Sequence, residues 1–145
     1  MLTIRPMQVY DVQSGAMLEK EIFTQPWTEQ GFIDAINLGK TVFLVAEENG
    51  KIAGYIGMYK SLDEGEITNV AVAPPMRCHG SGEQLLQESI KRAERQGIAR
   101  IVLEVRVSND SAIRLYERNG FKECGIRKGF YELPKEDAYI MIYGQ

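Results

Sequence analysis

The chain has 145 residues, of which 44% are hydrophobic and 26% are charged, and its formal net charge at pH 7 is −3. These values predict one globular domain over residues 1–145 with a real core, since two domains of ordinary size would need a longer chain. The weak acidic balance argues against sequence-independent binding to nucleic acid, which needs clustered Lys and Arg. No window has the length of a membrane span and the N-terminus lacks the apolar run of a signal peptide, so neither membrane association nor export is expected.

The cysteines and the single histidine bear on compartment and metal content. Two cysteines, Cys78 and Cys124, are too few for a disulfide framework, so reduced thiols in the cytoplasm are expected. One histidine and two widely separated cysteines do not offer the spacing of zinc ligands, so no metal site is expected.

The N-terminal part of the chain predicts a strand and two helices. Leu2–Pro6 is typical of a short strand closed by proline. Asp11 is a candidate N-cap for a helix that runs to about Phe23, and Thr28 is a candidate cap for a second helix. Helical spacing in that second helix places three apolar side chains on one face, namely Phe32, Ile33 and Ile36.

The middle of the chain predicts a β-hairpin, a further strand and a long helix. Asn49-Gly50 separates two β-rich runs and is the strongest short-range signal for a hairpin turn. A strand over about Glu66–Ala73 stops at Pro74-Pro75, and a helix over about Gly82–Gln96 ends at Gly97. One stripe of this helix is apolar, through Leu86, Ile90 and Ala93.

The last part predicts a strand over Arg100–Val107, a short helix that begins near Asn109 and ends at Gly120, and two closing strands. The order β-α-α-β-β-β-α-β-α-β-β indicates an α/β (mixed α+β) fold, with a mixed sheet of about seven strands and helices on both faces. The strand–helix–strand crossover from Glu66 to Val107 predicts that its two strands are parallel neighbours.

A glycine-containing turn, RCHGSG from Arg77 to Gly82, leads into the long helix. The first amides of a helix lack intrahelical partners, the helix dipole adds partial positive charge, and glycine lets a ligand approach the backbone. The turn is therefore a candidate phosphate site, with a tight turn that binds nothing as the alternative. The P-loop sequence is absent, and Leu85 stands where the third glycine of the dinucleotide-binding motif belongs.

Two motifs carry a resemblance to a known family. Arg-x-x-Gly-x-Gly after a strand that ends Val-Ala-Val-x-Pro resembles the acyl-CoA loop of the GCN5-related N-acetyltransferases. The downstream segment NDSAIRLYERNGF resembles the Asn-x-x-Ala-x-x-Leu-Tyr-x-x-x-Gly-Phe segment of that superfamily. The matching positions are Asn109, Ala112, Leu115, Tyr116, Gly120 and Phe121.

Three further segments resemble the bacterial ribosomal-protein alanine N-acetyltransferases of that superfamily: QPWTEQGF, LEVRVSN, and RKGFYE followed by EDAYIM. The chain departs from their pattern at Cys78 and His79, where polar or basic residues are usual, and at Ser81, where an aliphatic residue is common. Phe130 also replaces the first tyrosine of a Tyr-Tyr pair.

The resemblance implies that an acetyl group passes from acetyl-CoA to a protein N-terminal amine, such as the alanine of ribosomal protein S18, by direct attack in a ternary complex. The alternatives are acetylation of lysines or of a small amine, and a non-catalytic acyl-CoA-binding module.

The resemblance also implies a cofactor site. Backbone amides of the glycine turn would hold the pyrophosphate of acetyl-CoA, and the edge of the preceding strand would pair with the pantetheine amides. The backbone amide of Val72 is the candidate donor to the reaction's oxyanion. The residues expected to contact acetyl-CoA are Val70, Ala71, Val72, Arg77, Cys78, His79, Gly80, Ser81, Gly82, Glu83, Asn109, Ser111 and Tyr116.

Glu104 is a candidate general base because a carboxylate in the middle of an apolar strand is unusual and burial would raise its pKa. An ion pair with Arg106, two residues on, is the structural alternative. The resemblance makes Glu104 the base, acting directly or through a water, and Tyr116 the acid that protonates the sulfur of CoA. A role as a core aromatic is the alternative for Tyr116.

The acceptor groove is expected to contain Trp27, Asn69, Glu104 and Tyr131, although Trp27 and Tyr131 are also typical core aromatics. His79 is interpreted as a surface or phosphate contact because it lies on the phosphate side of the turn. A covalent acetyl-enzyme on Cys78 is disfavoured, because direct transfer is what the resemblance implies.

Overall fold

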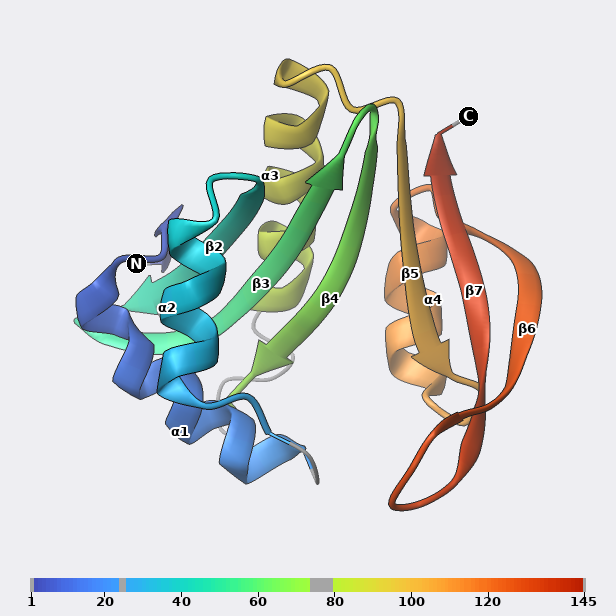
Figure 1. Cartoon of the computed structure of the whole chain (residues 1–145), viewed down its shortest axis with the longest axis horizontal. Helices are drawn as coiled ribbons and strands as arrows, with labels where there is room; N and C mark the ends of the chain where they lie inside the picture. The colour runs from blue at the N-terminus through green and yellow to red at the C-terminus, as the bar shows by residue number, and fades with distance from the viewer. Residues whose placement is uncertain (1, 24–25, 74–79, 145) are drawn as a thin grey trace.

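Figure 1 shows a computed structural model of the chain, in which residues 2–23, 26–73 and 80–144 are described. In chain order its elements are β1 (Leu2–Pro6), a 3-10 turn (Val9–Asp11), α1 (Val12–Ile22), α2 (Glu29–Asn37), β2 (Thr41–Glu48), β3 (Lys51–Ser61), β4 (Glu64–Val72), α3 (Ser81–Arg95), β5 (Arg100–Arg106), α4 (Asp110–Arg118), β6 (Lys122–Tyr131) and β7 (Glu136–Gly144). The element order and the α/β fold predicted from the sequence are confirmed, with small differences at the ends of elements.

Local signals account for most of these boundaries. Asn49 and Gly50 turn the β2–β3 hairpin with φ angles of 54° and 79°, as the primed hairpin turns require. Thr28 caps α2, because its side chain accepts a hydrogen bond from the amide of Gly31 at 3.1 Å.

Asp11 occupies the N-cap position of α1 as predicted, but its side chain does not cap the helix, since it makes no capping hydrogen bond. Its carboxylate instead accepts hydrogen bonds from the Arg5 guanidinium at 2.7 Å and from the amide of Gln8 at 2.8 Å. A nearby cation and the preceding turn therefore take the side chain away from the helix amides.

All seven strands lie in one sheet with the order β1-β2-β3-β4-β5-β7-β6. Every neighbouring pair is antiparallel except β4 and β5, which are parallel as the crossover through α3 predicted. No helix among the described residues is long and apolar enough to cross a membrane.

Helices cover both faces of the sheet, as predicted. On one face, α3 and α4 pack over a core that includes Leu86, Ile90 and Leu103 (Figure 1). On the other face, α1 and α2 pack over the first strands, and Phe32 is fully buried there against Tyr55. The second group of helices lies over β2–β4, as Figure 1 shows, so no helix of the described residues covers the corresponding face of β5–β7.

The parallel pair β4–β5 stays together over only part of its length. The two strands pair from Glu64↔Arg100 to Ile67↔Leu103, and their remaining residues do not pair with each other. Directly after this segment β4 carries a bulge at Thr68, where the register with β3 shifts between Met58↔Ile67 and Gly57↔Asn69. A bulge bends its strand and increases the local twist, so β4 turns away from β5 (Figure 1).

Candidate active site

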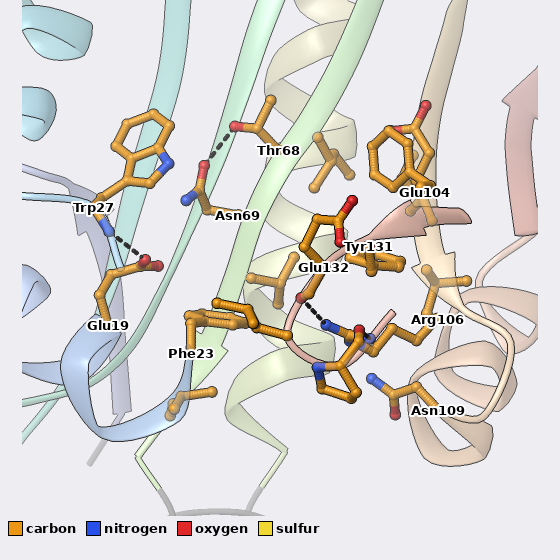
Figure 2. Close-up of a pocket in the computed structure, with 18 of the residues that line it drawn as sticks. Glu19, Phe23, Trp27, Thr68, Asn69, Glu104, Arg106, Asn109, Tyr131 and Glu132 are labelled. Carbon is orange, nitrogen blue, oxygen red and sulfur yellow. Dashed lines mark hydrogen bonds between the residues drawn. The ribbon is translucent and has the colours of Figure 1, made fainter. Parts of the chain in front are cut away.

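The opening between β4 and β5 is a cleft of about 560 Å³, within the range usual for sites that bind small molecules. The end of α1 and the segment before α2 supply one wall, and β5 with the β6–β7 loop supplies the other (Figure 2). Its lining includes Glu19, Phe23, Trp27, Thr68, Asn69, Val70, Glu104, Arg106, Asn109, Tyr116, Tyr131, Glu132 and Leu133.

Glu104 lies in the wall formed by β5, and its side chain is 11% exposed. Burial and the nearby Glu66 carboxylate raise the pKa of Glu104, and the Arg127 guanidinium opposes that rise. The expected effect of burial is thus present. The alternative ion pair with Arg106 is wrong: Glu104 pairs with Arg127 at 3.2 Å, and Arg106 pairs with Glu136 at 3.1 Å.

Tyr131 lies beside Glu104 in the cleft and is held by Arg106, whose guanidinium carbon is 4.3 Å from the centre of its ring. The same guanidinium donates hydrogen bonds to the backbone oxygens of Pro134 at 2.9 Å and Glu132 at 3.3 Å, which fixes the β6–β7 loop. Burial, followed by the charge of Glu104, raises the pKa of Tyr131 to about 12. Its phenol therefore keeps its proton at neutral pH.

Tyr116 lines the cleft from α4, and its ring packs on Phe121 with centroids 5.7 Å apart. It is 7% exposed, so it is both a core aromatic and a residue of the site. Burial, with a smaller contribution from Tyr131, raises the pKa of Tyr116, which leaves a protonated phenol at the cleft. Asn109 also lines the cleft, and its side-chain oxygen caps α4 by accepting a hydrogen bond from the amide of Ala112 at 3.3 Å.

A buried polar network forms the opposite wall. The Glu19 carboxyl accepts hydrogen bonds from the amide of Trp27 at 2.9 Å and from the Tyr55 hydroxyl. Asn69 donates to the Tyr55 hydroxyl at 3.3 Å and accepts from the Thr68 hydroxyl at 2.5 Å. Glu19 and Tyr55 are almost fully buried. The network therefore ties the segment before α2 to the bulge of β4, as Figure 2 shows in part.

The first turn of α3 lies beside the end of β4. Gly80 caps α3 with a φ of 83°, a left-handed conformation that favours glycine. The Ser81 side chain is buried, and its hydroxyl has no hydrogen-bond partner among the described residues. A Cβ at Gly82 would lie 3.6 Å from Val72 and 3.7 Å from Leu115, which is ordinary contact, so packing in the described chain does not require that glycine.

The cleft collects the residues predicted for the acceptor and for catalysis. Trp27 lines the cleft and also packs against Phe32, with ring centroids 5.4 Å apart. The predicted residues that line the cleft are Trp27, Asn69, Val70, Glu104, Asn109, Tyr116 and Tyr131. Those that do not line it are Ala71, Val72, Gly80, Ser81, Gly82, Glu83 and Ser111. Arg77, Cys78 and His79 lie outside the described residues.

The side chain of Glu83 is tied to the C-terminal end of α4. Its carboxylate accepts hydrogen bonds from the Asn119 side chain at 2.9 Å and from Arg118 at 3.4 Å, and these hold the pKa of Glu83 below its usual range. Among the described residues, no group of three or more His, Cys, Asp or Glu side chains is placed to hold a metal ion.

Sequence reasoning missed several residues of the cleft. Glu19 carried a usable signal, because helical spacing places it on the same stripe of α1 as the buried Val12 and Ala16. Glu132 carried no such signal, since its place in the cleft depends on which strands pair at the C-terminal end of the chain. The same holds for Arg127, which does not line the cleft but pairs with Glu104.

Comparison with known proteins defines the class of this fold and site. Residues 12–121 match the Acetyltransferase (GNAT) family, so the chain belongs to that family, and the predicted acetyltransferase class is confirmed. Among its relatives, the [ribosomal protein bS18]-alanine N-acetyltransferase of Escherichia coli is 37% identical over 97% of this chain and 96% of its own length. The N-alpha-acetyltransferase RimI of Mycobacterium tuberculosis is 32% identical over 97% of this chain and 90% of its own.

A solved structure of a similarly named protein has the same fold as this chain. The ribosomal-protein-S18-alanine N-acetyltransferase from Escherichia coli superposes with a TM-score of 0.92 at 34% identity, covering 99% of this chain and 94% of that one.

Proposed function

We propose that this protein transfers the acetyl group of acetyl-CoA to the N-terminal α-amine of a protein in the cytoplasm, with the N-terminal alanine of ribosomal protein S18 as its principal acceptor. The names and coverage of the relatives support this acceptor. The observation that carries the chemistry is the cleft, which places a shielded carboxyl, Glu104, and a protonated phenol, Tyr116, around one space.

Acetyl transfer requires that the amine lose a proton, that the thioester carbon be attacked, and that the leaving sulfur gain a proton. An α-amine has a pKa of ~8, so a modest base near neutrality is sufficient. Glu104 takes the amine proton, directly or through a water. The amine nitrogen adds to the thioester carbon to give a tetrahedral oxyanion. The C–S bond breaks as this oxyanion collapses, and Tyr116 supplies the proton to the departing thiolate.

The donor would enter from the side of α3. The amides of the first turn of α3 would hold the pyrophosphate, because they have no intrahelical partners. The contact distance between position 82 and Val72 places that turn at the end of β4. The pantetheine arm would then run along Val70–Val72 toward the cleft, past Asn109.

Paired peptides test the proposal. One peptide carries the N-terminal sequence of S18 with a free alanine amine and one internal lysine, and its partner is identical except that the α-amine is blocked. After incubation with acetyl-CoA, mass spectrometry should place one acetyl group on the α-amine of the first peptide and none on the second. Label on lysine in both peptides would support a lysine acetyltransferase instead. Tight binding of acetyl-CoA without label on any peptide or small amine would support a binding module.

A further inference from the structure

Arg127 reaches Glu104 across an intervening strand. Glu104 pairs with Ile140 of β7, and Arg127 pairs with Ala138 of the same strand. Because Ile140 and Ala138 are two residues apart on β7, Glu104 and Arg127 lie on the same face of the sheet. The Arg127 Nε atom is 3.2 Å from Oε2 of Glu104.

The other groups around Glu104 do not replace this cation. Glu66 on β4 is negatively charged, and Tyr131 on β6 keeps its phenol proton. Ile140 on β7 is apolar, and Arg106 on β5 itself is paired with Glu136 at 3.1 Å. Arg127 is therefore the cation that contacts Glu104 within the described residues.

We propose that Arg127 is a positioning residue that keeps Glu104 ionised in the free enzyme and releases it to the acceptor amine. This proposal rests on the proposed role of Glu104 as the base. A protonated carboxyl cannot accept a proton from the amine, and both burial and Glu66 favour the protonated form. The ion pair with Arg127 acts in the opposite direction.

The exposure of the two partners shows which of them can move. The Glu104 side chain is 11% exposed, whereas that of Arg127 is 57% exposed. Because Arg127 lies mostly in solvent, its guanidinium can be rehydrated when an acceptor amine takes its place beside Glu104. While the guanidinium is still near, it disfavours a second cation, so the acceptor amine is driven toward the neutral form that attacks.

The direct test is the titration of the Glu104 carboxyl by NMR in full-length protein with ¹³C-labelled glutamate side chains, its signal being identified by its loss in Glu104→Gln. In Arg127→Ala the midpoint should move to higher pH, and Arg127→Lys should restore most of the difference. Lys128→Ala is the matched control, because it removes the same charge from the next residue, which is exposed and forms no ion pair among the described residues. This control should titrate like the native protein.

Equal midpoints in Arg127→Ala and Lys128→Ala would overturn the proposal. Acetylation rates add a second readout: at mildly acidic pH the rate relative to that at pH ~8 should fall further in Arg127→Ala than in Lys128→Ala. The two failures are distinguishable. If the midpoint moves but Glu104→Gln stays fully active, the ion pair controls the carboxyl as inferred, and the assignment of Glu104 as the base is wrong.

Discussion

Replacement of Tyr55 by phenylalanine tests the network behind the cleft without reference to catalysis. The substitution keeps the buried ring against Phe32 and removes only the hydroxyl, which donates to Glu19 and accepts from Asn69. A buried polar group that loses its partner costs about 1–3 kcal/mol. Two groups are affected, but both border the cleft, where water can replace part of the loss. We therefore expect Tyr55→Phe to lower the free energy of unfolding by about 2 kcal/mol.

Urea unfolding followed by circular dichroism measures this change. With a slope of about 2 kcal/mol per molar urea, the midpoint should fall by about 1 M. Tyr59→Phe is the control, because Tyr59 packs on Trp27 and Phe43 while its hydroxyl makes no hydrogen bond among the described residues. The free energy of unfolding of Tyr59→Phe should stay within about 0.5 kcal/mol of that of the native protein. Equal stabilities of the two variants would refute the stabilising role of the network.

Other predictions concern the residues of the cleft and the loss of folding stability at acidic pH. Glu104→Gln should lower the acetylation rate at neutral pH, and a variant that is fully active at every pH contradicts the assignment of Glu104 as the base. Because burial and a neighbouring carboxylate raise the pKa of Glu104, the acetylation rate of the native enzyme should decline with falling pH at pH values above the pKa of an ordinary glutamate. Tyr116→Phe should reduce kcat while the circular dichroism spectrum, which reports the fold, stays unchanged. An unchanged kcat would show that Tyr116 has only a structural role. Arg106→Ala should raise KM for the acceptor peptide more than KM for acetyl-CoA, because the β6–β7 loop loses its anchor; equal rises would show that this loop does not contact the acceptor. Burial raises the pKa of Asp11, but hydrogen bonds from Arg5 outweigh it and hold that pKa below its usual range. The ionised Asp11 carboxylate therefore stabilises the fold above the unfolded-state pKa of ~3.9, and this stabilisation is lost as pH falls through the lower pKa of the folded state. Asp11→Asn should thus cost about 1–2 kcal/mol in urea unfolding at pH ~7 and much less below pH ~3, and an equal cost at both would contradict this linkage.

Sequence predicted the features whose causes are local. The hairpin at Asn49-Gly50, the cap at Thr28 and the apolar stripe that buries Leu86 depend on residues within one or two turns of each other. The parallel pairing of β4 with β5 was also predictable, because the handedness and length of a crossover through α3 leave few other arrangements.

Sequence did not predict which charged side chains would meet. The structural alternative for Glu104 was an ion pair with Arg106, two residues away, but each has its partner on a strand that arrives later in the chain. The contact between Glu19 and Tyr55 likewise joins residues 36 positions apart. Such choices depend on strand register, and a shift of one residue would turn strand side chains such as Tyr55 and Arg127 to the other face of the sheet. The bulge at Thr68 could not be predicted from the sequence, because no glycine marks it, yet it bends β4 where the cleft opens.

Because β4 and β5 share only four paired positions, the two walls of the cleft are built by largely separate pieces of chain. One wall comes from the residues before Ala73 and the other from those after Ala99, with α3 as the connection. Substitutions at positions of one wall that are not part of the hydrophobic core can change the shape of the cleft while the opposite wall keeps its own shape. The backbone thus provides a constant opening whose two sides can diversify independently.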